Sequence, residues 1–491
     1  MSADWPVVTL EDVTSKLGDG LHGTPEYDES GEYYFINGNN LGNGKITIDA
    51  KTKRASEKEF LKHKKDLNDR TILVSINGTI GNIGLYNGEK VFLGKSACYF
   101  NVKEGVDKQF IRYVVTSNYF QNHISSLASG STIKNVSLKL MRGFTFRLPP
   151  LVIQSKISKI LVDIDDKIEL NRQTNQILEH IAQTIFKSWF VDFEPTRAKI
   201  AAKQHWQALH GVVETSSPTC YSETDDTAKP NIQGLDEAMN QAAMTAISGL
   251  SRTDAAGAHL EELQQLSPEQ LQHLQSIAAL FPDALVDSEL GEIPEGWNWS
   301  EIGKEVTVVG GGTPSTKNQA FWEDGDINWT SPKDMSNLTD KILLETGRKI
   351  TCAGLAKISS GLLPTNTVLL SSRAPVGYLA IAKIPVAINQ GYIAMKCEHM
   401  LTPEYVIQWA DSVMDDIKQR ASGTTFAEIS KSNFRVIPIA LPSNELVMEY
   451  TSVASGLYEK ITKTLQESKS LIDLRDSLLP KLLSGELELE T

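Results

Sequence analysis

A long heptad pattern that occurs twice constrains this chain more than any other feature of its sequence. The seam of the first stretch, 150–193, is formed at alternating spacings of four and three by Ile157, Leu161, Ile164, Ile168, Asn171, Asn175, Leu178, Ala182, Ile185 and Trp189. The pattern returns 293 residues later, in the stretch 443–486, at Tyr450, Ala454, Leu457, Ile461, Thr464, Ser468, Leu471, Arg475, Leu478 and Leu482. Arg475 is its one poor fit. Such a seam predicts a helix that packs on another helix along its whole length. Forty-odd helical residues span roughly 60 Å.

Each predicted seam carries polar residues near its middle, Asn171 and Asn175 in the first and Thr464 and Ser468 in the second. An antiparallel pair brings these polar layers together. A parallel pair at another register leaves them facing hydrocarbon, which costs about 1–3 kcal/mol for each group. Buried polar seam residues commonly fix register. We favour that role over the alternative, in which these residues are partly exposed and fix nothing.

Length, charge and cysteine usage limit the class of protein. A chain of 491 residues suggests about three domains. The four cysteines are scattered without metal-ligand or disulfide spacing. We find no signal peptide and no apolar run near the roughly 18 residues of a membrane span, so a cytoplasmic location without a membrane partner is expected. The net charge of −13 is confined to residues 212–296, which hold 15 acidic and 2 basic side chains.

The remainder of the chain is neutral and reads as two related mixed α/β halves. In the first half, short apolar runs at 33–36, 71–76, 83–86, 97–102 and 144–148 predict strands, and 109–123 predicts one helix. In the second half, Gly312-Thr313-Pro314 corresponds to Gly23-Thr24-Pro25, and Gln390-Gly391 corresponds to Lys95-Ser96. Likewise 368–377 corresponds to 72–81, and 422–425 corresponds to 129–132. The expected fold class is α/β (α+β), with two similar domains separated by two long helices that form an antiparallel coiled coil.

The predicted domain organisation has five parts. Residues 1–149 form a first domain, 150–194 a long helix, 195–285 an acidic linker or helical insertion, 286–442 a second domain, and 443–491 a second long helix with its tail. Within the insertion, 215–230 is polar and turn-rich, which is typical of a loose linker. Ser267-Pro268-Glu269-Gln270 has the pattern of a helix start, and that helix should end before Pro282.

The sequence offers little catalytic chemistry. Gly88 and Gly94-Lys95-Ser96 resemble a phosphate-binding loop, but five residues separate the glycines where the motif has four, and the second half has no lysine there. No serine or cysteine lies in a nucleophile elbow, and no histidines pair at metal-ligand spacing. We therefore expect no catalytic residues, no metal and no cofactor, and a binding role becomes more plausible than an enzymatic one.

Loop residues of both halves carry side chains that suit nucleic acid. Asn, Gln and Arg can pair with base edges, whereas Ser, Thr and Lys usually hold phosphates. The candidate DNA-binding residues are Asn37, Asn39, Asn77, Thr79, Lys95, Ser131, Thr132, Lys134, Thr313, Ser331, Lys333, Ser372, Arg373, Gln390, Thr424 and Thr425. Arg373 is the strongest single candidate, because it follows a predicted buried strand. For any one of them, an ordinary surface turn explains the residue type as well.

Ordinary structural roles account for the remaining aromatic and basic residues. The tryptophans Trp322, Trp329 and Trp409 are interpreted as core residues rather than stacking platforms. A basic cluster, Lys51, Lys53, Arg54, Lys58, Lys62, Lys64 and Lys65, is by itself only a solvated face.

Three segments make the chain resemble the specificity (S) subunits of type I restriction-modification systems. Residues 185–193 read IFKSWFVDF and are followed by Glu194-Pro195, like the central conserved segment of that family. Residues 288–297 read SELGEIPEGW, like the entry to its second recognition domain. Residues 478–487 read LLPKLLSGEL, like its C-terminal repeat. With the duplicated layout, the resemblance covers nearly the whole chain.

The resemblance implies a sequence-specific DNA-binding subunit without catalytic activity. Each of two target-recognition domains would read one half of a bipartite, asymmetric site in double-stranded DNA. The subunit would recruit two methyltransferase (M) subunits, which bind S-adenosylmethionine, and two restriction (R) subunits in the full complex. Two alternatives remain open from the residues alone: a DNA methyltransferase or nuclease with degenerate motifs, and a structural coiled-coil scaffold with no DNA role.

Overall fold

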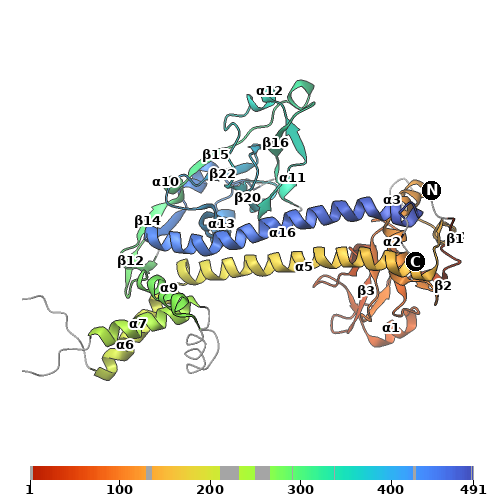
Figure 1. The fold of residues 1–491 in the computed structure, drawn as a ribbon, viewed down its shortest axis with the longest axis horizontal. Coiled ribbons are helices and arrows are strands. Elements are labelled where there is room, and N and C mark those ends of the chain that lie inside the picture. The colour runs from red at the N-terminus through yellow and green to blue at the C-terminus, as the bar shows by residue number, and fades with distance from the viewer. Residues whose placement is uncertain are drawn as a thin grey trace, which may run out of the picture. The chain divides into compact units, whose positions relative to one another are not determined.

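The computed structural model of the chain describes residues 4–128, 135–210, 232–248, 266–289, 291–336, 338–423, 427–487 and 489. Its contacts divide the chain into two compact units. The first unit comprises Met1–Leu170 and Glu467–Thr491, and the second comprises Asn171–Gln466. Each long helix therefore contributes one half to each unit, and the ribbon of Figure 1 shows both helices as continuous elements.

The first unit is built on a four-stranded sheet with order β2-β10-β7-β8 and a three-stranded sheet with order β6-β3-β9. Its strands are β1 (Val7–Thr9), β2 (Thr14–Asp19), β3 (Tyr33–Ile36), β4 (Leu41–Gly42), β5 (Lys45–Ile46), β6 (Arg54–Ala55), β7 (Thr71–Ser75), β8 (Ile83–Leu85), β9 (Val91–Leu93), β10 (Ala97–Val102) and β11 (Thr145–Arg147). Its shorter helices are η1 (Gly38–Asn40), α1 (Glu57–His63), α2 (Lys108–Thr116), α3 (Asn118–Leu127) and α4 (Leu138–Arg142). The five strands predicted for this half are all present. The buried runs of β7 and β10 lie side by side in the sheet.

The helix predicted over 109–123 was wrong as a single element. Ser117 interrupts it with extended backbone, and α2 ends where α3 begins. The Ser117 hydroxyl donates to Val114 O at 2.6 Å and accepts from Phe120 N at 3.3 Å. It thus caps the second helix, which is a competing use of serine that helical periodicity does not reveal. The second unit has a similar break at Val413, between α13 (Pro403–Ser412) and α14 (Met414–Gln419).

The second unit repeats this architecture with a five-stranded sheet of order β15-β22-β19-β20-β17 and a three-stranded sheet of order β18-β16-β21. Its strands are β12 (Leu285–Ser288), β13 (Gly291–Pro294), β14 (Asn298–Glu301), β15 (Thr307–Gly310), β16 (Ile327–Thr330), β17 (Ile342–Leu343), β18 (Arg348–Ile350), β19 (Thr367–Ser371), β20 (Leu379–Ala382), β21 (Ala387–Ile388), β22 (Tyr392–Lys396) and β23 (Pro438–Leu441). Its remaining short helices are α10 (Ile302–Glu305), η3 (Gln319–Phe321), α11 (Pro332–Met335), α12 (Cys352–Leu355) and α15 (Lys431–Arg435). In each domain a short antiparallel pair joins a strand near the start of the domain to its last strand. These pairs are β1-β11 in the first unit and β14-β23 in the second.

The long helices α5 (Leu151–Phe190) and α16 (Asn444–Ser484) confirm the heptad prediction. Every seam residue predicted above is buried or half-buried. In the first unit, Ile157 and Leu161 of α5 share a core with Leu482 of α16. In the second unit, Phe186 of α5 shares a core with Tyr450 of α16. The beginning of each helix therefore packs on the end of the other, so the pair is antiparallel.

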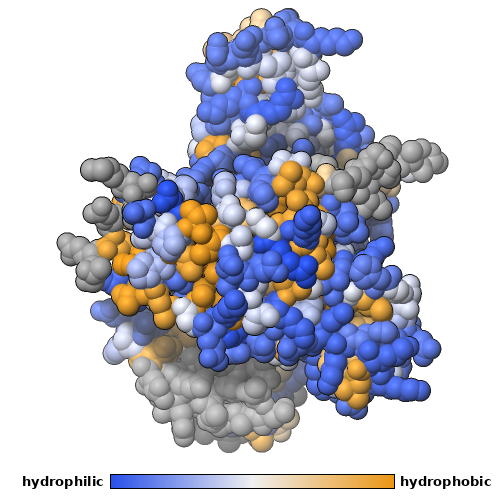
Figure 2. All heavy atoms as spheres, turned by 90° about the vertical axis from the view of Figure 1, so that its right-hand side faces the viewer, coloured by the Kyte–Doolittle hydropathy of each residue, from blue (hydrophilic) through white to orange (hydrophobic). Residues whose placement is uncertain are grey.

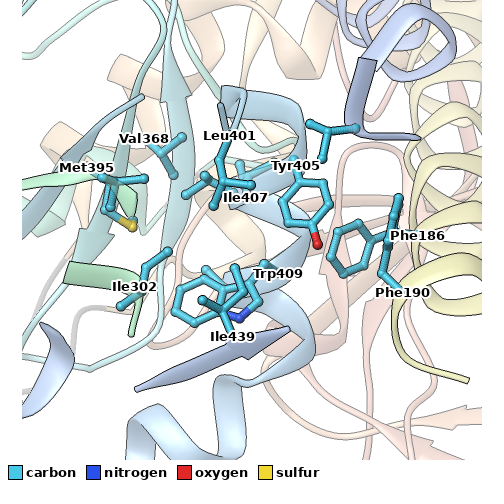
Figure 3. Close-up of a cluster of buried hydrophobic side chains, with 14 of the residues drawn as sticks. Phe186, Phe190, Ile302, Val368, Met395, Leu401, Tyr405, Ile407, Trp409 and Ile439 are labelled. Atoms are coloured by element: carbon cyan, nitrogen blue, oxygen red, sulfur yellow. The ribbon is translucent and has the colours of Figure 1, made fainter. Parts of the chain in front are cut away.

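Aromatic residues join the helix pair of the second unit to its domain. Figure 3 shows Phe186 and Phe190 of α5 pointing toward Tyr405 of α13, and the two ring-centroid distances to Tyr405 are 5.0 and 4.9 Å. Edge-to-face packing of this kind is favourable beyond the area it buries. Trp409 lies in the same core, as predicted. The motif IFKSWFVDF is thus a core segment that holds the second domain on α5.

In each unit, a carboxylate on α5 also ties the long helices to the domain. In the first unit, Asp165 accepts from Arg112 Nη2 at 2.8 Å and Tyr113 OH at 2.7 Å on α2, and from Arg475 Nη1 at 3.0 Å on α16. This contact explains why an arginine occupies a seam position. In the second unit, Glu179 accepts from Gln408 Nε2 on α13 at 3.0 Å.

Three of the four polar residues at the middle of the seam are buried, as the predicted register role requires, and Ser468 is half-buried. Asn171, Asn175 and Thr464 are each less than 5% exposed. The Asn175 side chain also hydrogen-bonds the Asp340 carboxylate. Burial raises the pKa of Asp340, because it outweighs the lowering effect of this hydrogen bond. That these residues set the helix register stays a prediction.

In the described part of the acidic segment lie the helices α6 (Glu194–His210), α7 (Ile232–Ile247) and α9 (Pro268–Ala279). Helix α7 packs on both α6 and α9. The predicted helix start is confirmed, because Ser267 and Gln270 form a reciprocal capping box, and α9 ends before Pro282. The linker predicted at 215–230 lies outside the described residues. Among the helices described, none is long and apolar enough to cross a membrane, and the visible surface is mainly hydrophilic with separate hydrophobic areas (Figure 2).

Candidate nucleic-acid interface

In both units two parallel strands end at the same edge of a small sheet. Strand β3 runs parallel to β9 in the first unit, and β16 runs parallel to β21 in the second. Because parallel strands point the same way, the loops that leave them start side by side. We call these loops, together with the turns packed against them, the first and second loop edge. The first comprises residues 20–21, 37–38, 76–77 and 94–96, and the second comprises 311–313, 331–332, 372–373 and 389–391.

Side chains join the loops of the first loop edge. Gly94 N donates to Ile36 O at 2.8 Å, which holds the two strand ends together. The Ser96 hydroxyl donates to Asn37 Oδ1 and accepts from Gly38 N, both at 2.9 Å. Lys95, between them in sequence, is exposed. The edge is therefore a rigid loop pair with one cation projecting from it.

The second loop edge has the same backbone connections with different side chains. Asn389 N donates to Thr330 O at 3.0 Å, in the manner of Gly94 and Ile36. The Thr313 hydroxyl donates to Gln390 Oε1 at 2.5 Å, and the Gln390 side chain is exposed. Asn and Gln amides of this kind suit adenine edges, which present an acceptor and a donor together.

A third loop joins each edge through two further hydrogen bonds that are repeated between the units. Ile76 N donates to Ser96 O at 2.9 Å, and Val136 N donates to Ile76 O at 2.9 Å. The counterparts are Ser372 N to Gly391 O at 2.8 Å and Ile429 N to Ser372 O at 3.0 Å. One backbone framework therefore presents two different sets of side chains.

A glycine close to each edge is required by the crowding there. A Cβ on Gly20 would lie 2.2 Å from Leu93 O, and a Cβ on Gly311 would lie 2.0 Å from Ile388 O. The neighbouring hydrogen bonds, Leu21 N to Leu93 O and Gly312 N to Ile388 O, are also equivalent. The correspondence predicted between Gly23 and Gly312 is therefore wrong by two residues, because backbone hydrogen bonding pairs Gly312 with Leu21.

The structure brings most of the described candidates of the first half together. Asn37 and Lys95 lie on the first loop edge, and Asn39 is exposed in η1, which begins there. Asn77 and Thr79 lie in the turn between β7 and β8, where Asn77 bridges to Asn135. Candidates Ser131, Thr132 and Lys134 lie outside the described residues, as do Thr424 and Thr425 of the second half.

In the second half, four candidates are less free than their sequence context suggested. Ser331 caps α11, because its N and Oγ both contact Asp334 Oδ2. Ser372 is buried and acts through its backbone. Arg373 Nη1 lies 3.6 Å from Glu428 Oε2, so its charge is partly neutralised, and Thr313 is bonded to Gln390. Lys333 is exposed.

The chain matches a family described as "Type I restriction modification DNA specificity domain" over residues 2–180 and 294–468, which is well over half of its length. The chain belongs to this family. It is 30% identical over 384 residues to the type I restriction enzyme HindI specificity subunit of Haemophilus influenzae, covering 76% of this chain and 75% of that one. It is 32% identical over 187 residues to the MjaIX specificity subunit of Methanocaldococcus jannaschii, covering 38% and 43%.

The structure agrees with the fold of this family. An S subunit from M. genitalium matches with a TM-score of 0.50 and 15% identity, covering 99% of this chain and 97% of that one. The predicted fold class and the predicted family are therefore confirmed. Specificity subunits are the non-catalytic DNA-recognition components of type I restriction-modification systems, and the domain matched twice here is the DNA target-recognition domain. The domain boundaries at 149 and 286 stay a prediction.

Proposed function

We propose that this specificity subunit reads a bipartite, asymmetric DNA target, with one half-site for each domain. The observation that carries this proposal is the repeated backbone framework of the two loop edges. Four hydrogen bonds recur in both, whereas the side chains on them differ, as with Lys95 and Gln390. The same approach to the duplex combined with different contacting groups favours two different half-sites.

On each loop edge and in the turns beside it we assign roles by side-chain chemistry. Asn37, Asn39, Asn77 and Gln390 are proposed to contact base edges, and Arg373 can do so once it leaves Glu428. Lys95 and Lys333 are proposed to hold phosphates, and so are the hydroxyls of Thr79, Thr313 and Ser331. Ser372 would act through its backbone. The remaining candidates, Ser131, Thr132, Lys134, Thr424 and Thr425, stay sequence-based proposals of the same kind.

We further propose that two methyltransferase subunits, which bind S-adenosylmethionine, and two restriction subunits assemble on this chain. Exposed apolar side chains on the long helices support a docking role for these helices. On α5 they include Leu170, Ile177 and Ile181, and on α16 they include Met448 and Leu474. Ile177 and Ile181 are one helical turn apart and share one face of α5, and exposed apolar side chains that lie together are typical of a protein interface.

The test is methylome sequencing of a host that expresses this chain with its cognate methyltransferase subunit. We expect a split, asymmetric motif with adenine methylated on both strands. An assembled complex that leaves no new methylated motif contradicts the proposal. DNA methylation by the purified chain alone, with S-adenosylmethionine supplied, would instead support the degenerate-enzyme alternative.

A domain exchange tests the division of labour between the two domains. Residues 1–149 are replaced by the corresponding domain of another specificity subunit, and the methylated motif is determined again. Because each domain carries its own complete loop edge, we expect one half of the motif to change and the other to persist. The matched control exchanges residues 286–442 and should change only the other half. A motif in which both halves change after either exchange contradicts independent reading.

A further inference from the structure

Each domain also carries a cation beside an aromatic pair, where it lies over both rings in the second domain and over one ring in the first. In the second domain, Arg348 lies over the Trp322 ring at 3.5 Å and over the Trp329 ring at 5.5 Å. In the first, Lys53 lies over the Tyr27 ring at 6.0 Å. The rings of Trp322 and Trp329 are 5.0 Å apart and those of Tyr27 and Phe35 are 6.2 Å apart. We call these sets the second and first cation–aromatic triad.

Backbone pairing shows that the cation and its strand partner occupy equivalent positions in the two triads. Trp329 is opposite Arg348 in the β16–β18 ladder, and Phe35 N donates to Lys53 O at 2.9 Å directly beside the corresponding β3–β6 pair. Phe35 directly precedes Ile36, and Trp329 directly precedes Thr330. The carbonyls of Ile36 and Thr330 are the ones that accept the equivalent loop-edge hydrogen bonds described above. The residue types differ at all three positions, so sequence identity does not reveal this correspondence.

Both cations are exposed and free to meet an anion. Among the residues that the structure describes, no carboxylate lies within ion-pair distance of the Lys53 ammonium or the Arg348 guanidinium. Arg420, in contrast, is neutralised by both carboxylate oxygens of Asp416, at 2.8 and 2.9 Å. A ring face attracts and orients a guanidinium without using its N–H donors. All of the Arg348 side-chain donors therefore stay available for a phosphate.

Each triad adjoins its loop edge. The indole Nε1 of Trp329 donates to Gly312 O at 3.1 Å, and that of Trp322 donates to Ser315 O at 3.1 Å. In the first domain, a Cβ on Gly94 would lie 2.8 Å from the Phe35 ring. The cations are therefore attached to the same rigid support as the proposed base-contacting loops. Trp329 is buried, as predicted, but Trp322 is only partly buried and presents its ring to a cation.

We infer that Arg348 and Lys53 are positioning contacts that clamp a DNA phosphate beside each loop edge and fix the register in which that edge meets the bases. This inference rests on the proposed function. A phosphate contact carries no sequence information of its own. It supplies salt-dependent affinity for any duplex, and a fixed cation on an aromatic platform loses little freedom when it binds.

The test measures the binding of the full chain, in complex with its methyltransferase subunit, to a mixed-sequence duplex over a range of salt concentrations. For Arg348→Gln we expect about tenfold weaker binding. The slope of log K against log salt should become shallower by about 0.9, the amount expected for one lost phosphate contact. Lys53→Gln should have the same effect on the slope. The double variant should make the slope shallower by about twice as much as either single variant. Arg348→Lys should keep the wild-type slope.

The matched control is Arg420→Gln, which removes an arginine that is already paired with a carboxylate and should leave the slope unchanged. If Arg348→Gln lowers the melting temperature of the chain but leaves the slope at its wild-type value, the triad is structural and the inference is overturned. A wild-type complex that binds the duplex with this salt dependence but methylates no motif would contradict the proposed function alone. A wild-type complex that binds no duplex would overturn both.

Discussion

At the scale of residues, Asp165 shows how one carboxylate serves three partners at once. It accepts from Arg112 and Tyr113 of α2 and from Arg475 of α16. The Arg112, Asp165 and Arg475 side chains are 18%, 16% and 29% exposed, so these charges are partly desolvated. Removing one member of such a set is costly when it leaves the others unpaired.

We therefore predict different costs for two substitutions at this site. Asp165→Ala removes the acceptor of the Tyr113 hydroxyl and the shared carboxylate partner of both arginines, and it should destabilise the chain by about 3 kcal/mol. Arg475→Leu restores an apolar seam residue, and Asp165 keeps two donors, so the cost should be below about 1 kcal/mol. Chemical unfolding of the full chain measures both. Equal losses for the two variants would show that the carboxylate is not the shared acceptor.

At the scale of elements, the break between α2 and α3 shows a side chain overriding helical periodicity. Ser117→Ala removes the acceptor for Phe120 N and the donor to Val114 O. We expect a loss of about 1 kcal/mol in unfolding free energy, as for other N-cap serines. Ser126→Ala is the control, because Ser126 lies within α3, is exposed, and its hydroxyl bonds only to His123 O. A control variant as destabilised as Ser117→Ala would contradict the capping role.

At the scale of the whole molecule, the duplicated chain combines two loop edges with one pair of long helices. Both helices run about forty residues, α5 with 40 and α16 with 41. We expect the length of this pair to set the distance between the half-sites. Adding one heptad to both helices lengthens each by about 10 Å, which matches about 3 base pairs at roughly 3.4 Å per pair. The methylated motif of the variant should therefore contain a spacer longer by about 3 base pairs.

A matched insertion separates this effect from chain length alone. The same number of residues added within 215–230, which the sequence predicts to be a linker, should leave the spacer unchanged. A heptad added to only one helix shifts its seam against the other and should impair assembly. An unchanged spacer after both helices are lengthened would reject the idea that they act as a ruler.

The sequence by itself determined the elements whose signals are local or repeated. The heptad spacing predicted α5 and α16 because a helix returns the same face every three or four residues, and apolar residues on that face must be buried. The strands β3, β7, β8, β10 and β11 followed from short apolar runs between turn residues. The capping box at Ser267 was visible because its two partners are three residues apart. The family followed from motifs that are continuous in the chain.

Only the tertiary structure decided which side chains act together. Ser96 meets Asn37 across 59 residues, and Thr313 meets Gln390 across 77. Arg475 meets Asp165 across 310 residues, and this contact alone explains a charge on the seam. The two cation–aromatic triads share no residue type, so the equivalence of Arg348 with Lys53 and of Trp329 with Phe35 appears only in strand pairing. Such contacts depend on how distant segments pack, and no local periodicity records that packing.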